Sequence, residues 1–168
     1  MQTSAYENIS EHPERAVRFK DAMEYFQTAP GFETTRVLES FDWDVIGHGT
    51  VVDVGGSHGV VCVDLARKYP SLQFVVQDRE EVIAAVEVPS DVADRVRFEV
   101  HDFFTEQRVK NADVYFFRWI LHNWSDKYCI QILKALIPAL KPQARVLIQD
   151  LLLPEPGTMS PFLERKQR

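Results

Sequence analysis

The stretch Val51-Val52-Asp53-Val54-Gly55-Gly56-Ser57-His58-Gly59 decides the fold. It joins an apolar, β-branched run to a carboxylate and then to a glycine-rich turn, after which a helical pattern begins. Glycine allows left-handed backbone conformations and close approach of a ligand, and the free N–H groups of the following helix face whatever binds there. The stretch therefore predicts a nucleotide-binding loop between a buried strand and a helix.

Strands and helices alternate regularly from Thr50 onward. Strand-like runs are expected at 50–54, 73–77, 96–100, 113–117 and 145–150, and helical patterns at about 58–69, 79–88 and 126–140. Such alternation is typical of an α/β fold, a Rossmann-like, doubly wound parallel sheet with right-handed crossovers. Ligands of these sheets lie beyond the carboxyl ends of the strands, near the point where strand order reverses.

Short helices are expected before the sheet begins. A helical pattern that starts at Pro13 carries the apolar stripe Phe19, Met23 and Phe26, which is more typical of a core face than of a ligand pocket. A second short pattern covers 35–41, and a turn at 47–49 leads into the first strand. Residues 1–49 are thus predicted to be an N-terminal helical linker segment, and residues 50–168 the binding domain.

Composition narrows the class of partner. With 168 residues, 45% of them hydrophobic and a net charge of −6, the chain is expected to form a globular domain that binds a small molecule rather than nucleic acid. It has no signal-peptide pattern and no apolar run of the ~20 residues that span a bilayer, so a cytoplasmic location is expected. Cys62 and Cys129 lie in helical patterns without metal-ligand spacing; we expect buried free thiols and no metal.

Polar or aromatic side chains follow every predicted strand. A carboxylate at Asp78, 25 residues after Asp53, can accept the ribose hydroxyls of a nucleoside. One acidic residue at a strand end is more often a helix cap, but a full set in register favours a binding site. The strand ends carry the glycine turn, then Asp78, then Asp102 and Phe103, then Arg118 through Trp124, and finally Asp150.

Glycine spacing distinguishes two classes of nucleotide loop. A nicotinamide-dependent oxidoreductase needs G-x-G-x-x-G, but Ser57 and Val60 occupy the second and third glycine positions. The sequence instead fits Asp-x-Gly-x-x-x-Gly, with Asp53, Gly55 and Gly59. This acid-first spacing favours the first motif of S-adenosylmethionine (SAM) binders.

A second segment, Phe117-Arg118-Trp119-Ile120-Leu121-His122-Asn123-Trp124-Ser125-Asp126-Lys127-Tyr128-Cys129, supplies the chemistry. Together with Val51–Gly56 and Asp150-Leu151-Leu152-Leu153-Pro154, it closely resembles the SAM-dependent class I O-methyltransferases of the plant caffeate and fungal polyketide (sterigmatocystin-type) family. The segment Glu11–Arg15 is similar to the one that precedes the catalytic domain in fungal members. The resemblance implies methyl transfer from SAM to a hydroxyl of a phenolic secondary metabolite.

The resemblance also implies a role for each matched residue. The methionine end of SAM, its ribose and its adenine would each have partners, and a base–acid pair would act on the acceptor. The implied cofactor residues are the loop glycines Gly55, Gly56 and Gly59 for the methionine end, Asp53 as the acid of the same motif, Asp78 for the ribose, Asp102 for the adenine amino group, Phe103 and Trp124 flanking the adenine ring, and Arg118 near the cofactor; the implied catalytic residues are His122 as general base and Asp150, which orients it.

Three departures from the family pattern leave an alternative open. Ser57-His58 replaces the commoner Gly-Thr, and Asn123 stands where an aspartate frequently follows the base. Relatives also continue with a helix and two strands, carry a second carboxylate there, and form homodimers through an N-terminal domain. We therefore expect a family member truncated at both ends, with an apolar edge strand exposed. The alternative is a catalytically inactive remnant that acts as a SAM-binding or interaction module. His48, His58 and His101 are expected in turns or at the surface.

Overall fold

The computed structural model describes residues 33–150 together with 12, 14, 15, 18, 155, 157, 158 and 160. It separates into two compact units, residues 1–42 and 43–168, and each is described by itself. In the first unit, helix α3 (Thr34–Ser40) forms where a short helix is predicted. The predicted apolar stripe on Phe19, Met23 and Phe26 lies outside the described residues, and the domain boundary between residues 49 and 50 remains a prediction.

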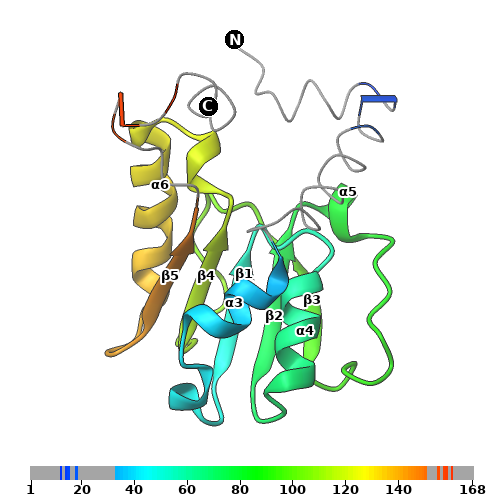
Figure 1. The fold of residues 1–168 in the computed structure, drawn as a ribbon. Coiled ribbons are helices and arrows are strands. Elements are labelled where there is room, and N and C mark those ends of the chain that lie inside the picture. Colours follow the sequence, from blue (N-terminus) through cyan, green and yellow to red (C-terminus); the bar gives the residue numbers. More distant parts are fainter. Residues whose placement is uncertain are drawn as a thin grey trace. The chain divides into compact units, whose positions relative to one another are not determined.

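The second unit is built on a five-stranded parallel sheet, which confirms the predicted fold class (Figure 1). The order β3-β2-β1-β4-β5 places β1 and β4 side by side, so the chain leaves the centre of the sheet first in one direction and then in the other. The strand-order switch therefore lies between the ends of β1 and β4. The strands are β1 (Thr50–Val54), β2 (Gln73–Asp78), β3 (Val96–Val100), β4 (Val114–Arg118) and β5 (Arg145–Gln149).

Helices cover both faces of the sheet. Alternation along β1 directs Val52 and Val54 into a core with Ile132 of α6 (Asp126–Leu136). Asp53, between them, points to the other face, where it contacts α4 (Val60–Lys68). Shorter elements are α5 (Glu80–Ile83) and the 3₁₀ turns η1 (Trp43–Ile46), η2 (Leu121–Asn123) and η3 (Ile137–Ala139).

Three local predictions are wrong. Helix α5 ends at Ile83 rather than at residue 88, although Pro89 alone disfavours helical backbone only at the residue directly before it. His101 is 5% exposed rather than on the surface, because its side chain faces a small internal cavity that α6 also lines. Cys62 is buried as predicted, but Cys129 is only half-buried.

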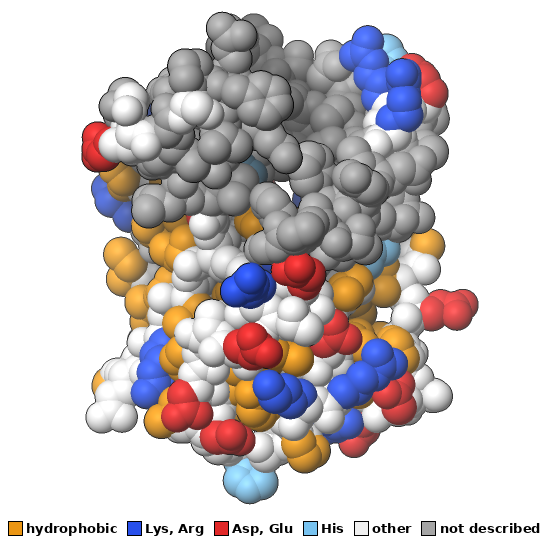
Figure 2. All heavy atoms as spheres, viewed as in Figure 1, with side chains coloured by type: hydrophobic (Ala, Val, Ile, Leu, Met, Phe, Trp, Pro, Cys, Tyr) orange, Lys and Arg blue, Asp and Glu red, His pale blue; other side chains and the backbone are white. Residues whose placement is uncertain are grey.

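Strand β5 forms one edge of the described sheet, and its apolar Val146 and Ile148 are exposed as predicted, whereas Leu147 is half-buried. Ile148 is 50% exposed, whereas Val52 on β1 is fully buried. Figure 2 shows acidic and basic side chains intermingled over the described part of the viewed face. No helix within the described residues is long and apolar enough to cross a membrane.

Candidate active site

The glycine loop turns tightly over the ends of β1 and β2. The N–H groups of Gly55 and Gly56 both donate to the carbonyl of Gln77, at 2.8 and 3.1 Å. Gly55 has a φ of +77°, which favours glycine. A Cβ at Gly56 would lie 2.6 Å from the Asp53 carboxylate. After the turn, Gly59 is the N-cap residue of α4. Because the loop is hydrogen-bonded to the end of β2, its main chain lies near the point where the strand order switches between β1 and β4.

Asp78 ties the end of β2 to this loop. Its Oδ2 accepts a hydrogen bond from the Ser57 N–H at 2.9 Å, and its Oδ1 accepts one from the Arg79 N–H at 2.8 Å. Burial nevertheless raises the pKa of Asp78 above its usual value, with the two backbone donors opposing the shift. The carboxylate is thus held at the rim of the loop, where the sequence predicts a ribose partner.

Asp53 lies beneath the loop and is only 3% exposed. The thiol of Cys62 on α4 donates to its Oδ2 at 3.4 Å. Burial raises the pKa of Asp53 to about 7, while the thiol and the guanidinium of Arg118 oppose the shift and Asp78 adds to it. The first acidic residue of the motif is therefore an internal group that supports the loop from below.

Aromatic side chains gather after β3 and β4. Phe103 and Trp124 meet edge-to-face, with ring centroids 5.9 Å apart and planes at 81°, and Phe104 and Tyr128 extend the cluster. Asp102 lies in the loop after β3, and its Oδ1 accepts the Phe104 N–H at 2.9 Å. The structure thus brings the predicted adenine-side residues together, with the two rings in contact with each other.

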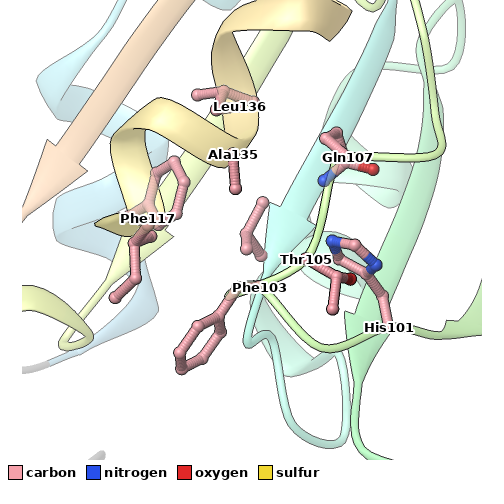
Figure 3. Close-up of a pocket in the computed structure, with 9 residues that line it drawn as sticks. His101, Phe103, Thr105, Gln107, Phe117, Ala135 and Leu136 are labelled. Atoms are coloured by element: carbon pink, nitrogen blue, oxygen red, sulfur yellow. The ribbon is translucent and has the colours of Figure 1, made fainter. Parts of the chain in front are cut away.

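A small cavity lies between α6 and the loop that follows β3 (Figure 3). Its volume is about 10 Å³, enough for one water molecule and far too small for a nucleoside. His101 and Gln107 line it, and Gln107 exchanges two amide hydrogen bonds with Gln77 at 2.8 and 2.9 Å. Phe103 of the aromatic cluster also lines this cavity, so the cavity lies beside that cluster.

His122 and Asp150 form a pair across the ends of β4 and β5. The imidazole Nδ1 of His122, in η2, is hydrogen-bonded to Oδ1 of Asp150, and the His122 backbone N–H donates to Oδ2 at 3.1 Å. Both carboxylate oxygens therefore engage the same residue. The His122 side chain is 36% exposed. Because a carboxylate only accepts, Nδ1 is the donor in the contact with Asp150, and Nε2 is the other ring nitrogen.

Arg118 and Trp119 connect the end of β4 to the turn that carries His122. The guanidinium of Arg118 stacks 3.7 Å from the centre of the Trp119 ring, and its Nε donates to Gln149 Oε1 at 3.0 Å. The next residue, Ile120, covers the loop, because a Cβ at Gly55 would lie 2.5 Å from its Cδ1. The segment after β4 thus packs directly on the loop after β1.

Sequence reasoning missed three of these contacts. All three depend on backbone geometry. They are the hydrogen bond from the Ser57 N–H to Asp78, the packing of Ile120 on Gly55, and the hydrogen bond from the Asn123 amide to the Trp119 carbonyl at 3.0 Å. Only the glycines gave a signal for the first two. Among the described residues, no group of three His, Cys, Asp or Glu side chains could hold a metal ion.

A doubly wound sheet with a glycine loop and a carboxylate at the next strand end defines a domain that binds a nucleoside-containing cofactor. The acid-first glycine spacing and the His–Asp pair narrow this class to methyltransferases. The chain belongs to the O-methyltransferase domain family, whose model matches residues 1–163.

Relatives and solved structures agree with this assignment. The chain is 48% identical to a grayanic acid biosynthesis cluster O-methyltransferase of Cladonia grayi, over 98% of this chain and 37% of that protein. A methyltransferase in calicheamicin biosynthesis, solved with S-adenosylhomocysteine (SAH), matches with a TM-score of 0.76 and 29% identity over 98% of this chain and 48% of that one.

An O-methyltransferase from neocarzinostatin biosynthesis, in complex with SAM and 2-hydroxy-5-methyl naphthoic acid, matches with a TM-score of 0.74 and 25% identity over 87% of this chain and 44% of that one. The chain thus spans less than half the length of these three proteins. The cofactor of the family is S-adenosylmethionine.

Proposed function

We propose that this chain binds S-adenosylmethionine and takes part in methyl transfer to a hydroxyl of a phenolic small molecule, with His122 as general base. The observation that carries the proposal is the double engagement of His122 by Asp150, beside a glycine loop of the acid-first type. The bound cofactor would supply an electrophilic methyl group on a sulfonium. The protein's own residues have to bind, align and deprotonate.

The described residues fit this cofactor. The close approach of Gly56 to Asp53 leaves no room for a side chain, so the loop's main chain lines the site. Asp78 is already oriented by two backbone donors and is the group we assign to the ribose hydroxyls. Asp102 would read the adenine amino group with its second carboxylate oxygen, with Phe103 and Trp124 beside the ring and Arg118 nearby.

His122 is suited to remove a proton from a phenol. A phenol has a pKa of about 10, so a neutral imidazole near pH 7 can accept its proton as the oxygen attacks. Asp150 keeps the proton on Nδ1 and stabilises the imidazolium that forms. The rest of the rate enhancement comes from aligning the phenol oxygen with the methyl group of SAM, because methyl transfer is an in-line displacement.

Calorimetric titration of the folded chain with SAM tests the binding half. Replacing Asp78 with Asn should weaken SAM by roughly 10- to 100-fold, because a hydrogen bond to a charged group is worth about 1.5–3 kcal/mol. The exposed Asp94→Asn variant is the matched control and should bind as the wild type does. No detectable heat at high micromolar SAM would refute cofactor binding.

Product analysis with labelled SAM tests the chemical half. Suitable acceptors are a chlorinated phenol and a hydroxynaphthoic acid, since relatives are a chlorophenol O-methyltransferase and an enzyme solved with a naphthoic acid. His122→Ala should abolish transfer while SAM affinity is unchanged. Turnover equal to wild type would remove the base assignment, and SAM binding without transfer to any phenol would favour the SAM-binding module.

A further inference from the structure

Trp119 has an unusual backbone conformation directly before the base-bearing turn. Its φ is +56°, in the left-handed region that a bulky side chain rarely adopts. Such conformations persist only where surrounding contacts enforce them, and they concentrate at functional sites. Directly after Trp119, Ile120 packs on Gly55, and η2 begins at Leu121.

Three contacts hold Trp119 in place. Its N–H donates to the carbonyl of Gln149 on β5 at 2.9 Å, and its ring stacks 3.7 Å from the guanidinium of Arg118. Its carbonyl accepts a hydrogen bond from the side-chain amide of Asn123 at 3.0 Å. This last hydrogen bond joins residue 123 back to residue 119. His122 is therefore part of the short segment of chain that it closes.

The geometry points to Asn123 as a positioning residue: its amide locks the left-handed Trp119 turn and thereby presents both the backbone N–H and the imidazole Nδ1 of His122 to Asp150. Two hydrogen bonds from one residue to one carboxylate require the backbone and the ring to be placed together. The inference rests on the proposed role of His122 as general base, and extends it to the residue that sets the base's orientation.

The side chain at position 123 has to be a donor for this purpose. An aspartate, frequent at this position in the family, has the same shape but only accepts when ionised, and so it cannot bind the Trp119 carbonyl. Asn123, which replaces the aspartate frequent in the family, therefore supplies the hydrogen-bond donor that this turn uses.

Proton exchange measured by NMR on the ¹⁵N-labelled chain tests the proposal without any need for activity. Asn123→Ala should speed exchange of the His122 backbone N–H and imidazole Nδ1–H roughly tenfold, because the strained turn then opens more often. Asn123→Asp should do the same, which separates loss of the donor from loss of volume. Gln131→Ala, which removes an exposed amide on α6, is the control and should leave both rates unchanged.

A second background makes the test specific. Glycine adopts a φ of +56° without strain, so in a Trp119→Gly chain the Asn123→Ala change should alter exchange by less than about twofold. Unchanged exchange in Asn123→Ala, or the same tenfold effect in the Trp119→Gly background, would overturn the positioning role. Where the wild type transfers methyl groups, Asn123→Ala should lower kcat with the KM for SAM unchanged. A wild type without transfer contradicts the proposed function, while the exchange rates still decide this inference.

Discussion

The two sides of the candidate site are built differently. The donor side, where we propose that the methyl donor binds, comprises the ends of β1 and β2. It is an internal structure, in which Asp53 is 3% exposed and Gly56 has no room for a Cβ. The acceptor side, where we propose that the phenol is deprotonated, comprises His122, Asp150 and β5. Here the His122 side chain is 36% exposed, and β5 has exposed residues along its length. The donor side is thus defined by packing within the described sheet, whereas the acceptor side is defined by a few hydrogen bonds at its edge.

This difference has a consequence for how each side tolerates change. Interiors are close-packed, so small volume or charge changes there are costly. Groups at an exposed edge lose little when they are altered, because water replaces the lost contacts. Substitutions should therefore affect folding on the donor side and chemistry on the acceptor side.

Gly56→Ala is expected to have the largest effect on folding. Its Cβ would meet the Asp53 carboxylate at 2.6 Å and Val76 Cγ1 at 2.8 Å, and both neighbours are buried. We expect the free energy of unfolding to fall by about 3 kcal/mol, as overpacking a close-packed site does. Urea denaturation measures the loss.

Gly47→Ala is the control for this prediction. Nothing lies within 4 Å of a Cβ there, but the φ of +62° gives alanine the strain of a left-handed conformation. A loss of about 1 kcal/mol is expected. If Gly56→Ala costs no more than Gly47→Ala, the loop is not tightly packed on the sheet, and the contrast between the two sides fails.

Asp53→Asn should change how stability depends on pH. The pKa of Asp53 is about 7 in the folded chain, against about 3.9 for a free aspartate. Between these values the folded state holds a proton that the unfolded state has lost, so this group lowers the free energy of unfolding as pH rises from about 4 to 7. Asparagine removes that penalty.

The stability advantage of Asp53→Asn over wild type should grow by about 2.5 kcal/mol between pH 5 and pH 8. Urea denaturation at each pH measures it. Asp91→Asn is the control. The Arg67 guanidinium beside Asp91 holds the pKa of that exposed carboxyl below its usual value, so its pH dependence lies outside this window. A parallel pH profile for Asp53→Asn and wild type would show that the carboxyl is hydrated and not internal.

The same contrast explains which features the sequence could predict. The strands and the glycine loop follow from local patterns, because burial on both faces of a parallel sheet requires continuous apolar runs and a tight turn requires glycine. The position of Asp78 at a strand end predicts a ribose partner, whereas the role of His122 follows only from the resemblance, since a strand end does not reveal what the side chains after it contact. The burial of His101 and the amide contact of Asn123 depend on loop conformations that no local pattern encodes.

A matched pair of valines tests the contrast most directly, with the smallest expected effect. Val52 on β1 and Val146 on β5 flank Tyr115 in one row of the sheet, in registers that pair each of them with that residue. Val52 is fully buried, and Val146 is 37% exposed. Threonine keeps the shape of valine and adds a hydroxyl.

Burying that hydroxyl without a partner costs about 1–3 kcal/mol, so Val52→Thr should lower the free energy of unfolding by about 1.5 kcal/mol. Val146→Thr should lower it by less than about 0.5 kcal/mol, because its hydroxyl remains hydrated. Urea denaturation of the two variants compares the same chemical change on the two sides of one tyrosine. Equal losses would mean that β5 is covered in solution, and the acceptor side would then be as internal as the donor side.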